Sequence, residues 1–249
     1  MWKRSGTYAI SPHHKQVGTS FRLFLKMALV PYTRNDYLPM FHEETRSFKY
    51  ANHTIEINQN WANSGVAGVV WDAALILGTF LQNISTGNTK LSGLDTLQGK
   101  NVLELGAGTG LVGIVGYLLG ANVVITDTKA ALEITRENVV RNLNEDDGRK
   151  NFWQVKELCW GVDLDKWKDT SWDLILGADI VYVQETFQEL LETLKILTDS
   201  NKLTNILLSC RIRYQRDLDF LKLLEKSFLV SEIFYDKYHD VKIFNAIRH

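Results

Sequence analysis

The run Asn101-Val-Leu-Glu-Leu-Gly-Ala-Gly-Thr-Gly110 has the composition of a nucleotide-binding turn. An apolar strand, with the acidic residue Glu104 near its end, leads into the turn. Glycine has no Cβ and takes positive φ without steric cost, so backbone and ligand can approach closely. A helix without charged residues follows, so we expect a ligand between the strand's carboxyl end and the helix N-terminus. The turn itself holds Gly106, Ala107, Gly108 and Gly110.

The glycine spacing fits two kinds of cofactor. Gly108-x-Gly110-x-x-Gly113 satisfies the dinucleotide fingerprint, and Asp127 ends the next predicted strand, as binding of a ribose requires. Glu104 favours a different cofactor, because its carboxylate would repel a pyrophosphate at the helix N-terminus. S-adenosylmethionine has no phosphate, and it carries a sulfonium and an α-ammonium group that suit a carboxylate. The turn therefore favours S-adenosylmethionine over NAD.

Three more side chains are candidates for the same cofactor. Asp127 lies 23 residues after Glu104, where its carboxylate can bind both ribose hydroxyls; as an alternative, it caps the next helix. Trp160 follows the third predicted strand, where an indole can stack on an adenine or simply fill the core. Trp71 offers the same two possibilities at the start of a helix.

The fourth predicted strand runs into Asp179-Ile-Val-Tyr182. Aminomethyltransferases that act on bases usually have Asn/Asp-Pro-Pro-Tyr here, and the loss of both prolines disfavours a flat platform for a base. An amine acceptor fits better. A free lysine has a pKa of about 10.4, so little of it is neutral at pH 7, and only the neutral amine can accept a methyl group. The site must therefore hold the neutral amine in line with the leaving group. Asp179 would orient or help deprotonate the amine, and Tyr182 would shape a channel. The alternative is a turn cap and a core aromatic.

The segment Arg211-Ile-Arg213-Tyr214 follows the fifth predicted strand. We interpret it as a solvated loop, and an acidic feature of a partner protein is an alternative ligand for its two arginines.

Composition excludes several classes of function. The 249 residues are 45% hydrophobic, enough for the core of one large α/β domain. Cys159 and Cys210 are the only cysteines and form no CxxC pair, which favours a reducing compartment. The histidines show no metal-binding spacing, so no metal site is predicted. Residues 1–26 carry five Lys or Arg and no acidic residue, so residues 27–249 have a net charge of −6. A domain this acidic is a poor binder of nucleic acid.

The uncharged stretch from Leu105 to Thr126 raises the question of a membrane span. Six glycines in these 22 residues, bracketed by Glu104 and Asp127, instead indicate a strand end, a turn, a buried helix and a further strand. We therefore predict no membrane segment.

The elements that position these residues alternate along the chain. Hydrophobic patterning predicts a hairpin at 47–59, a helix at 72–81, strands at 101–105, 122–126, 153–158, 172–177 and 204–210, and helices at 109–119, 129–143, 185–198 and 217–227. Two final strands, 228–235 and 241–247, have no helix between them and should pair antiparallel. The predicted fold is a Rossmann-like, mostly parallel α/β sheet with an antiparallel C-terminal strand at one edge. Residues 1–26 form a basic, disordered extension, and residues 27–249 a single domain whose core sheet spans 101–249.

With these motifs the chain resembles the seven-strand, non-histone protein lysine methyltransferases over about residues 27–249. The likeness is closest to the branch that methylates the cytosolic seventy-kilodalton heat-shock chaperones. The segments that carry it are Met27-Ala-Leu-Val-Pro-Tyr, Tyr50-Ala-Asn-His-Thr-Ile-Glu-Ile, Val70-Trp-Asp-Ala-Ala, the glycine turn, Leu176-Gly-Ala-Asp-Ile-Val-Tyr and Cys210-Arg-Ile-Arg-Tyr.

The resemblance implies a cytoplasmic enzyme that also reaches the nucleus and adds up to three methyl groups to a chaperone lysine. It places Asp179 and Tyr182 beside the lysine channel. The cofactor residues that the resemblance implies are Trp71, Gly106, Ala107, Gly108, Asp127, Trp160 and Ala178. The interpretation of the glycine turn adds Glu104 and Gly110 to the predicted cofactor site. We expect the chain to be a monomer. Two alternatives remain open from the sequence: a non-catalytic adapter that binds a chaperone, and an NAD-dependent oxidoreductase.

Overall fold

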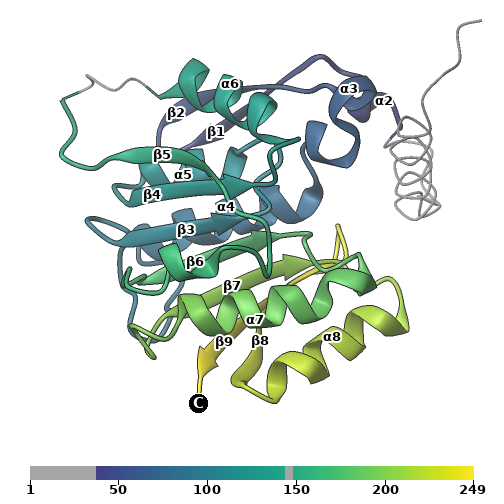
Figure 1. Ribbon diagram of the computed structural model, residues 1–249. Helices are drawn as coiled ribbons and strands as arrows, with labels where there is room; N and C mark the ends of the chain where they lie inside the picture. Colours follow the sequence, from purple (N-terminus) through teal and green to yellow (C-terminus); the bar gives the residue numbers. More distant parts are fainter. Residues whose placement is uncertain (1–37, 144–147) are drawn as a thin grey trace, which may run out of the picture. The chain divides into compact units, whose positions relative to one another are not determined.

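A seven-stranded sheet organises the computed structural model, which describes residues 38–143 and 148–249 (Figure 1). The predicted extension 1–26 lies outside the described residues. The strand order is β5-β4-β3-β6-β7-β9-β8. The strands are β3 (Asn101–Leu105), β4 (Asn122–Asp127), β5 (Trp153–Glu157), β6 (Leu174–Ala178), β7 (Asn205–Cys210), β8 (Phe228–Asp236) and β9 (Val241–Arg248).

The predicted fold class is confirmed, with one difference in detail. Strands β3 to β7 pair in parallel, and β9 pairs antiparallel with both β7 and β8. The antiparallel strand therefore lies one position in from the edge, and β8 forms the edge itself. Burial explains this order, because β9 has four consecutive buried residues whereas β8 is mostly exposed along its length. The more apolar strand takes the inner position.

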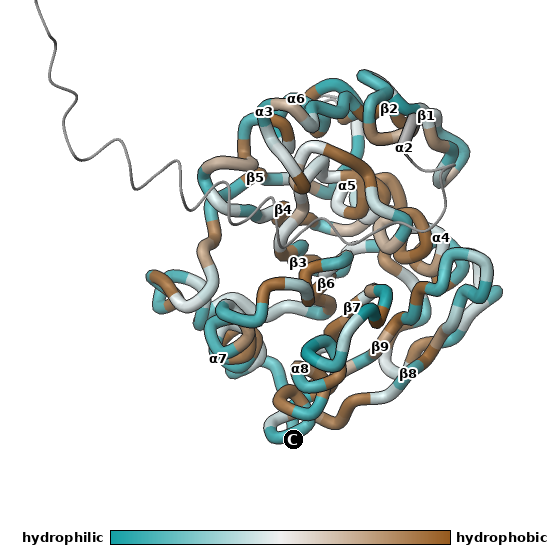
Figure 2. The backbone as a smooth tube through the Cα atoms, turned by 90° about the vertical axis from the view of Figure 1, so that its right-hand side faces the viewer, coloured by the Kyte–Doolittle hydropathy of each residue, from teal (hydrophilic) through white to brown (hydrophobic). Residues whose placement is uncertain are grey.

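Helices cover both faces of the sheet, and the side chains alternate between them. Val102 packs with α4 (Asp72–Ser85) and α5 (Leu111–Leu118), whereas Leu103 packs with α7 (Phe187–Leu197) and α8 (Gln215–Glu225). Figure 1 shows α7 and α8 in front of the sheet and α4 and α5 behind it. In Figure 2, brown hydrophobic segments lie at the central strands β3 and β6. Both faces of the central strands are therefore buried.

A smaller N-terminal unit packs on α6 (Leu132–Asn142) and α4. The predicted hairpin is present as β1 (Thr45–Tyr50) and β2 (His53–Asn58), paired antiparallel. The Asn138 side chain of α6 bonds both backbone groups of Asn58 and also donates to the Thr109 carbonyl, 3.1 Å away. Asn138 thus joins the hairpin to the glycine turn. The remaining short elements are α2 (Leu38–Phe41), α3 (Trp61–Ser64), and the 3₁₀ turns η1 (Gly65–Gly68), η2 (Leu164–Lys166) and η3 (Gln184–Thr186).

Across the described ranges, no single helix is long and apolar enough to cross a membrane. One pair bent by 51°, Trp61–Gly68 with Asp72–Ser85, meets the length and composition test together.

Helix α5 packs tightly on the sheet at one of its two glycines, Gly113, and less tightly at the other, Gly116. A Cβ on Gly113 would lie 2.5 Å from Ile125 Cγ1 and 2.6 Å from Glu104 Oε2. A Cβ on Gly116 would meet only Val123, at an ordinary 3.6 Å. Gly113 is therefore required by packing, and it explains the third glycine of the dinucleotide-like pattern without any dinucleotide.

We predict that Gly113→Ala destabilises the protein by about 1–3 kcal/mol, because the added methyl overpacks a closed interface. Gly116→Ala in the same helix is the matched control, and it should be neutral or stabilising by up to about 1 kcal/mol, since alanine favours helix. Urea unfolding of both variants measures the difference. Equal stabilities for the two variants would contradict the packing role of Gly113.

Candidate active site

The glycine turn between β3 and α5 follows a path that side chains would obstruct. Gly106, Gly108 and Gly110 all have positive φ, at 61°, 52° and 82°. A Cβ on Gly106 would lie 2.8 Å from Ile180 Cγ2, and one on Gly108 would lie 3.0 Å from the Ala67 carbonyl oxygen. The turn is thus held between η1 on one side and the segment after β6 on the other.

Glu104 lies beneath this turn and has a partner within the protein. Its side chain is buried, and Oε2 accepts a hydrogen bond of 2.8 Å from the Gly113 backbone N–H in the first turn of α5. The pKa of Glu104 is raised to about 8: burial raises it most, the bond from Gly113 lowers it in part, and the charge of nearby Asp127 adds a smaller increase. The carboxyl group therefore ties the end of β3 to the start of α5.

Asp127 connects the end of β4 to the glycine turn. Its Oδ2 accepts a 2.8 Å bond from the Gly108 N–H, and its Oδ1 accepts a 2.6 Å bond from the Thr128 N–H. Burial raises the pKa of this carboxyl group. The capping alternative is wrong, because α6 begins at Leu132 after Ala131 and has no side-chain cap. The carboxylate instead stands at the strand's carboxyl end, where a ribose would bind.

The two candidate tryptophans lie beside the turn. Trp71 is the residue before α4, and its Nε1 donates a 2.9 Å bond to the Val66 carbonyl of η1, the 3₁₀ turn that faces Gly108. Trp160 lies on the other side, with Cζ2 at 3.7 Å from the position of a Cβ on Gly106. Both indoles are half-buried, as is Ala178 at the end of β6. The glycine cradle, two indoles and a carboxylate fit a nucleoside without phosphates.

Asp179 occupies a strained position directly after β6. Its φ is +54°, a left-handed conformation that costs a non-glycine residue about 1–2 kcal/mol. Its backbone N–H donates to the Ser209 carbonyl at 2.7 Å. Its two carboxylate oxygens accept bonds of 3.0 and 2.9 Å from the Arg213 guanidinium. Asp179 is therefore fixed through both its backbone and its side chain.

The prediction that residues 211–214 form a solvated loop is wrong. The Arg213 side chain is only 13% exposed and pairs with Asp179, and Arg211 lies 3.5 Å from the buried Asp72 carboxylate. The reason is strand adjacency: β6 and β7 are parallel neighbours, so residues that follow them meet at one edge. Arg213 and Asp72 are the polar residues that sequence reasoning missed here.

Tyr182 interacts electrostatically with Asp127 and with Asp179, the two carboxylates predicted for the cofactor and the acceptor. Burial raises its pKa to about 12, with further contributions from the negative charges of Asp127 and Asp179. The phenol therefore stays neutral at physiological pH, so it can line a channel or make a hydrogen bond without acting as a phenolate base. Since Asp127 is predicted on the cofactor side and Asp179 on the acceptor side, Tyr182 is suited to the boundary between them.

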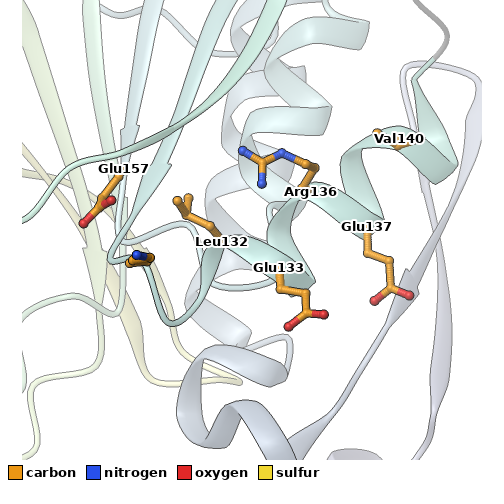
Figure 3. A pocket seen from close by; sticks show the side chains of 7 residues that line it. Leu132, Glu133, Arg136, Glu137, Val140 and Glu157 are labelled. Carbon is orange, nitrogen blue, oxygen red and sulfur yellow. The ribbon is translucent and has the colours of Figure 1, made fainter.

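A separate open groove of about 630 Å³ runs along α6 (Figure 3). None of the predicted site residues lines it. The labelled side chains Glu133, Arg136 and Glu137 project from α6, and Glu157 comes from the end of β5. This lining is dominated by charged groups, typical of a solvated helix face.

Comparison with known proteins agrees with this geometry. The family model for lysine methyltransferases matches residues 49–227. Protein N-lysine methyltransferase METTL21A from Danio rerio is 49% identical over 224 residues, covering 89% of this chain and 97% of its own. EEF1A lysine methyltransferase 3 from Xenopus tropicalis is 35% identical, covering 84% and 87%. A solved structure from Streptococcus mutans, described as a SAM-dependent methyltransferase, superposes with a TM-score of 0.52 at 14% identity, covering 82% and 55%.

The sheet order is that of a Rossmann-like fold, which the chain shares with the Streptococcus mutans structure. The match to the lysine methyltransferase model and the 49% identical relative define the class as a methyltransferase, with S-adenosylmethionine as its cofactor. The chain belongs to the lysine methyltransferase family, and it is a protein lysine N-methyltransferase. The cofactor and the reaction predicted from the sequence are thereby confirmed, and the NAD-dependent oxidoreductase is set aside. The roles of the individual site residues stay predictions.

The buried Glu104 predicts a pH dependence of stability. Because its pKa rises from 4.5 to about 8 on folding, the folded chain keeps a proton there that the unfolded chain loses between these values. Wild-type stability therefore falls as pH rises through this window, by up to about 1.4 kcal/mol per pH unit from this group. Glu104→Gln cannot lose the proton. We expect its stability relative to wild type to increase from pH 5 to 8 and to level off above.

Urea unfolding at several pH values measures this difference, and Glu133→Gln on the exposed face of α6 is the control. The control should follow the wild-type pH profile. Parallel profiles for Glu104→Gln and wild type would show that burial of Glu104 does not couple protonation to folding.

Proposed function

We propose that this enzyme adds up to three methyl groups to a lysine of a seventy-kilodalton heat-shock chaperone. The observation that carries the acceptor assignment is the segment Asp179–Tyr182, which follows β6 without prolines and ends in a neutral, mostly buried tyrosine. The chaperone assignment is supported by the resemblance carried by the sequence stretches around Asn52 and Arg211. The 49% identity to METTL21A supports a protein lysine as the acceptor.

The proposed mechanism assigns each residue a task at a stated group. When bound, S-adenosylmethionine supplies an electrophilic methyl group on a sulfonium. Gly106 and Gly108 would let the backbone approach its nucleoside, and Asp127 would accept hydrogen bonds from the ribose hydroxyls. Tyr182 lines the channel with a phenol that excludes water, and Asp179 orients the lysine amine so that its lone pair lies in line with the leaving group.

We also propose a cytoplasmic location, with the nucleus as a second compartment. Both cysteines are free thiols, Cys159 exposed and Cys210 buried, and this fits a reducing environment. Fractionation of cells that express the tagged chain tests this directly, and recovery from a secretory compartment would contradict it.

Transfer of label from tritiated S-adenosylmethionine tests the substrate. We expect incubation with a methyl-depleted cytosolic extract to label a protein that mass spectrometry identifies as the seventy-kilodalton chaperone, with the label in methyl-lysine. Asp179→Asn should lose this label because the amine is no longer oriented. Asp199→Asn, a half-exposed aspartate paired with Lys202, should keep it.

Two other results of this experiment would change the proposed function. Label on EEF1A, the protein named in the 35% identical relatives, would replace the chaperone by a different substrate. A stable complex with the chaperone but no methyl transfer to it would favour the adapter alternative for this partner.

A thermal-shift comparison tests the cofactor site. S-adenosylhomocysteine at 100 times its Kd should stabilise the protein by about 2.7 kcal/mol, and NAD at equal concentration should have no effect. Asp127→Ala should weaken the response to S-adenosylhomocysteine. Stabilisation by NAD alone would contradict the proposed role of the glycine turn.

A further inference from the structure

We propose that Arg213 is a positioning residue for methyl transfer: its guanidinium fixes Asp179 beside the acceptor amine and offsets the negative charge of that carboxylate. The proposal rests on the assignment of Asp179 to the lysine channel made above. It gives a task within the reaction to a residue that the sequence alone indicated to be solvated.

The geometry of the contact is that of a fork. Arg213 Nη1 lies 3.0 Å from Asp179 Oδ1, and Nη2 lies 2.9 Å from Oδ2. The two side chains are 13% and 10% exposed. Two parallel charge-assisted bonds fix the plane of the carboxylate as well as its position, which a single bond from a lysine cannot do.

Arg213 is itself anchored to the start of α8. The buried Asp217 carboxylate accepts bonds of 2.8 Å from the Arg213 backbone N–H and 2.9 Å from the Tyr214 N–H. Tyr214 and Asp217 also form a capping box at the N-terminus of this helix. A continuous series of hydrogen bonds therefore leads from α8 through Arg213 to Asp179.

Asp179 depends on such support because its backbone is left-handed. A φ of +54° is less costly for an aspartate than for most non-glycine residues, but contacts that hold it still stabilise it. The bond from its N–H to Ser209 holds the backbone, and the Arg213 fork holds the carboxylate. Without the fork, the carboxylate would be free to rotate away from the amine.

Arg213 affects the acceptor amine through its positive charge as well as through the geometry of its hydrogen bonds. Only the neutral amine has a lone pair for the methyl group, and an isolated carboxylate nearby would favour the ammonium form. The guanidinium offsets that effect, so the amine can be oriented without being kept protonated. Asp179 pairs with Arg213 and interacts electrostatically with Asp72 of α4, Tyr182 after β6 and Cys210 of β7. The charged groups that act on these neighbours in turn are Arg46, Arg211 and His239 on Asp72, Asp127 on Tyr182, and Asp217 and Lys242 on Cys210.

The test compares Arg213→Gln and Arg213→Lys with wild type, with the recombinant chaperone as substrate. Measured are kcat across pH, KM for the chaperone and the Kd of S-adenosylhomocysteine. Arg213→Gln should lower kcat by about 100-fold with an unchanged Kd, because a catalytic group misplaced by about 1 Å loses roughly that factor. Its kcat profile should also shift to higher pH, since kcat reports ionisations of the bound complex.

Arg213→Lys distinguishes the effect of the positive charge from the effect of the two-bond contact with Asp179. It also serves as the second variant if Arg213→Gln fails to fold. It keeps the charge and loses the fork, so kcat should fall while the pH profile stays near that of wild type. Full activity of Arg213→Lys would overturn the positioning role. A wild-type kcat and pH profile in Arg213→Gln would overturn the whole inference.

Two further comparisons distinguish positioning from general damage. Adding Arg213→Gln to Asp179→Asn should lower kcat no further if Arg213 acts through Asp179, and an additive loss would contradict that. Arg248→Gln is the matched control, since Arg248 is 17% exposed, pairs with Asp199 and is at the far end of β9. An equal loss in this control would assign the effect to stability alone.

The inference and the proposed function can fail separately. If wild type methylates no chaperone lysine, the substrate assignment fails, and the same variants are compared on the protein band that wild type labels in extract. If wild type methylates the chaperone and the Arg213 variants match it, only the inference fails.

Discussion

The hydrogen bond between the Gly113 N–H and the buried Glu104 carboxyl group fixes the turn on which the site is built. It joins the last part of β3 to the first turn of α5, and Gly113 is a glycine because a Cβ would collide with this carboxyl group. With the two ends held, the backbone of Gly106 and Gly108 must take its left-handed path between Ile180 and η1. The carboxyl end of the strand beside this path is where we propose that the nucleoside binds.

Two other carboxylates at this edge are held in different ways, which suits the different tasks that we propose for them. Asp127 bonds to backbone N–H groups on each of its oxygens and so stays at the turn. Asp179 bonds to a guanidinium and lies within a nearly neutral pair. The first arrangement leaves a negative group for ribose hydroxyls, and the second limits the charge that an acceptor amine would experience. Tyr182, neutral and mostly buried, is influenced by both.

Local sequence patterns predicted most of the fold because its central strands β3, β6 and β7 are buried on both faces and its helices have clear apolar sides. The glycine turn, Asp127 and Asp179 could be found because each directly follows a strand, and parallel strands end at a common edge. The order of β8 and β9 could not be predicted, since it depends on which strand of the hairpin buries more surface. The pairing of Arg213 with Asp179 was also missed. It joins residues 34 positions apart, and only the adjacency of β6 and β7 brings them together.

The most direct test of this account is a crystal structure with S-adenosylhomocysteine and a lysine-containing fragment of the substrate. We expect the adenosine at the glycine turn beside Trp71 and Trp160, with its ribose hydroxyls on Asp127. The lysine amine should lie by Tyr182 and Asp179, with the Arg213 fork intact. A nucleoside bound elsewhere, such as the groove on α6, or a lysine that reaches the cofactor away from Asp179, would contradict the account.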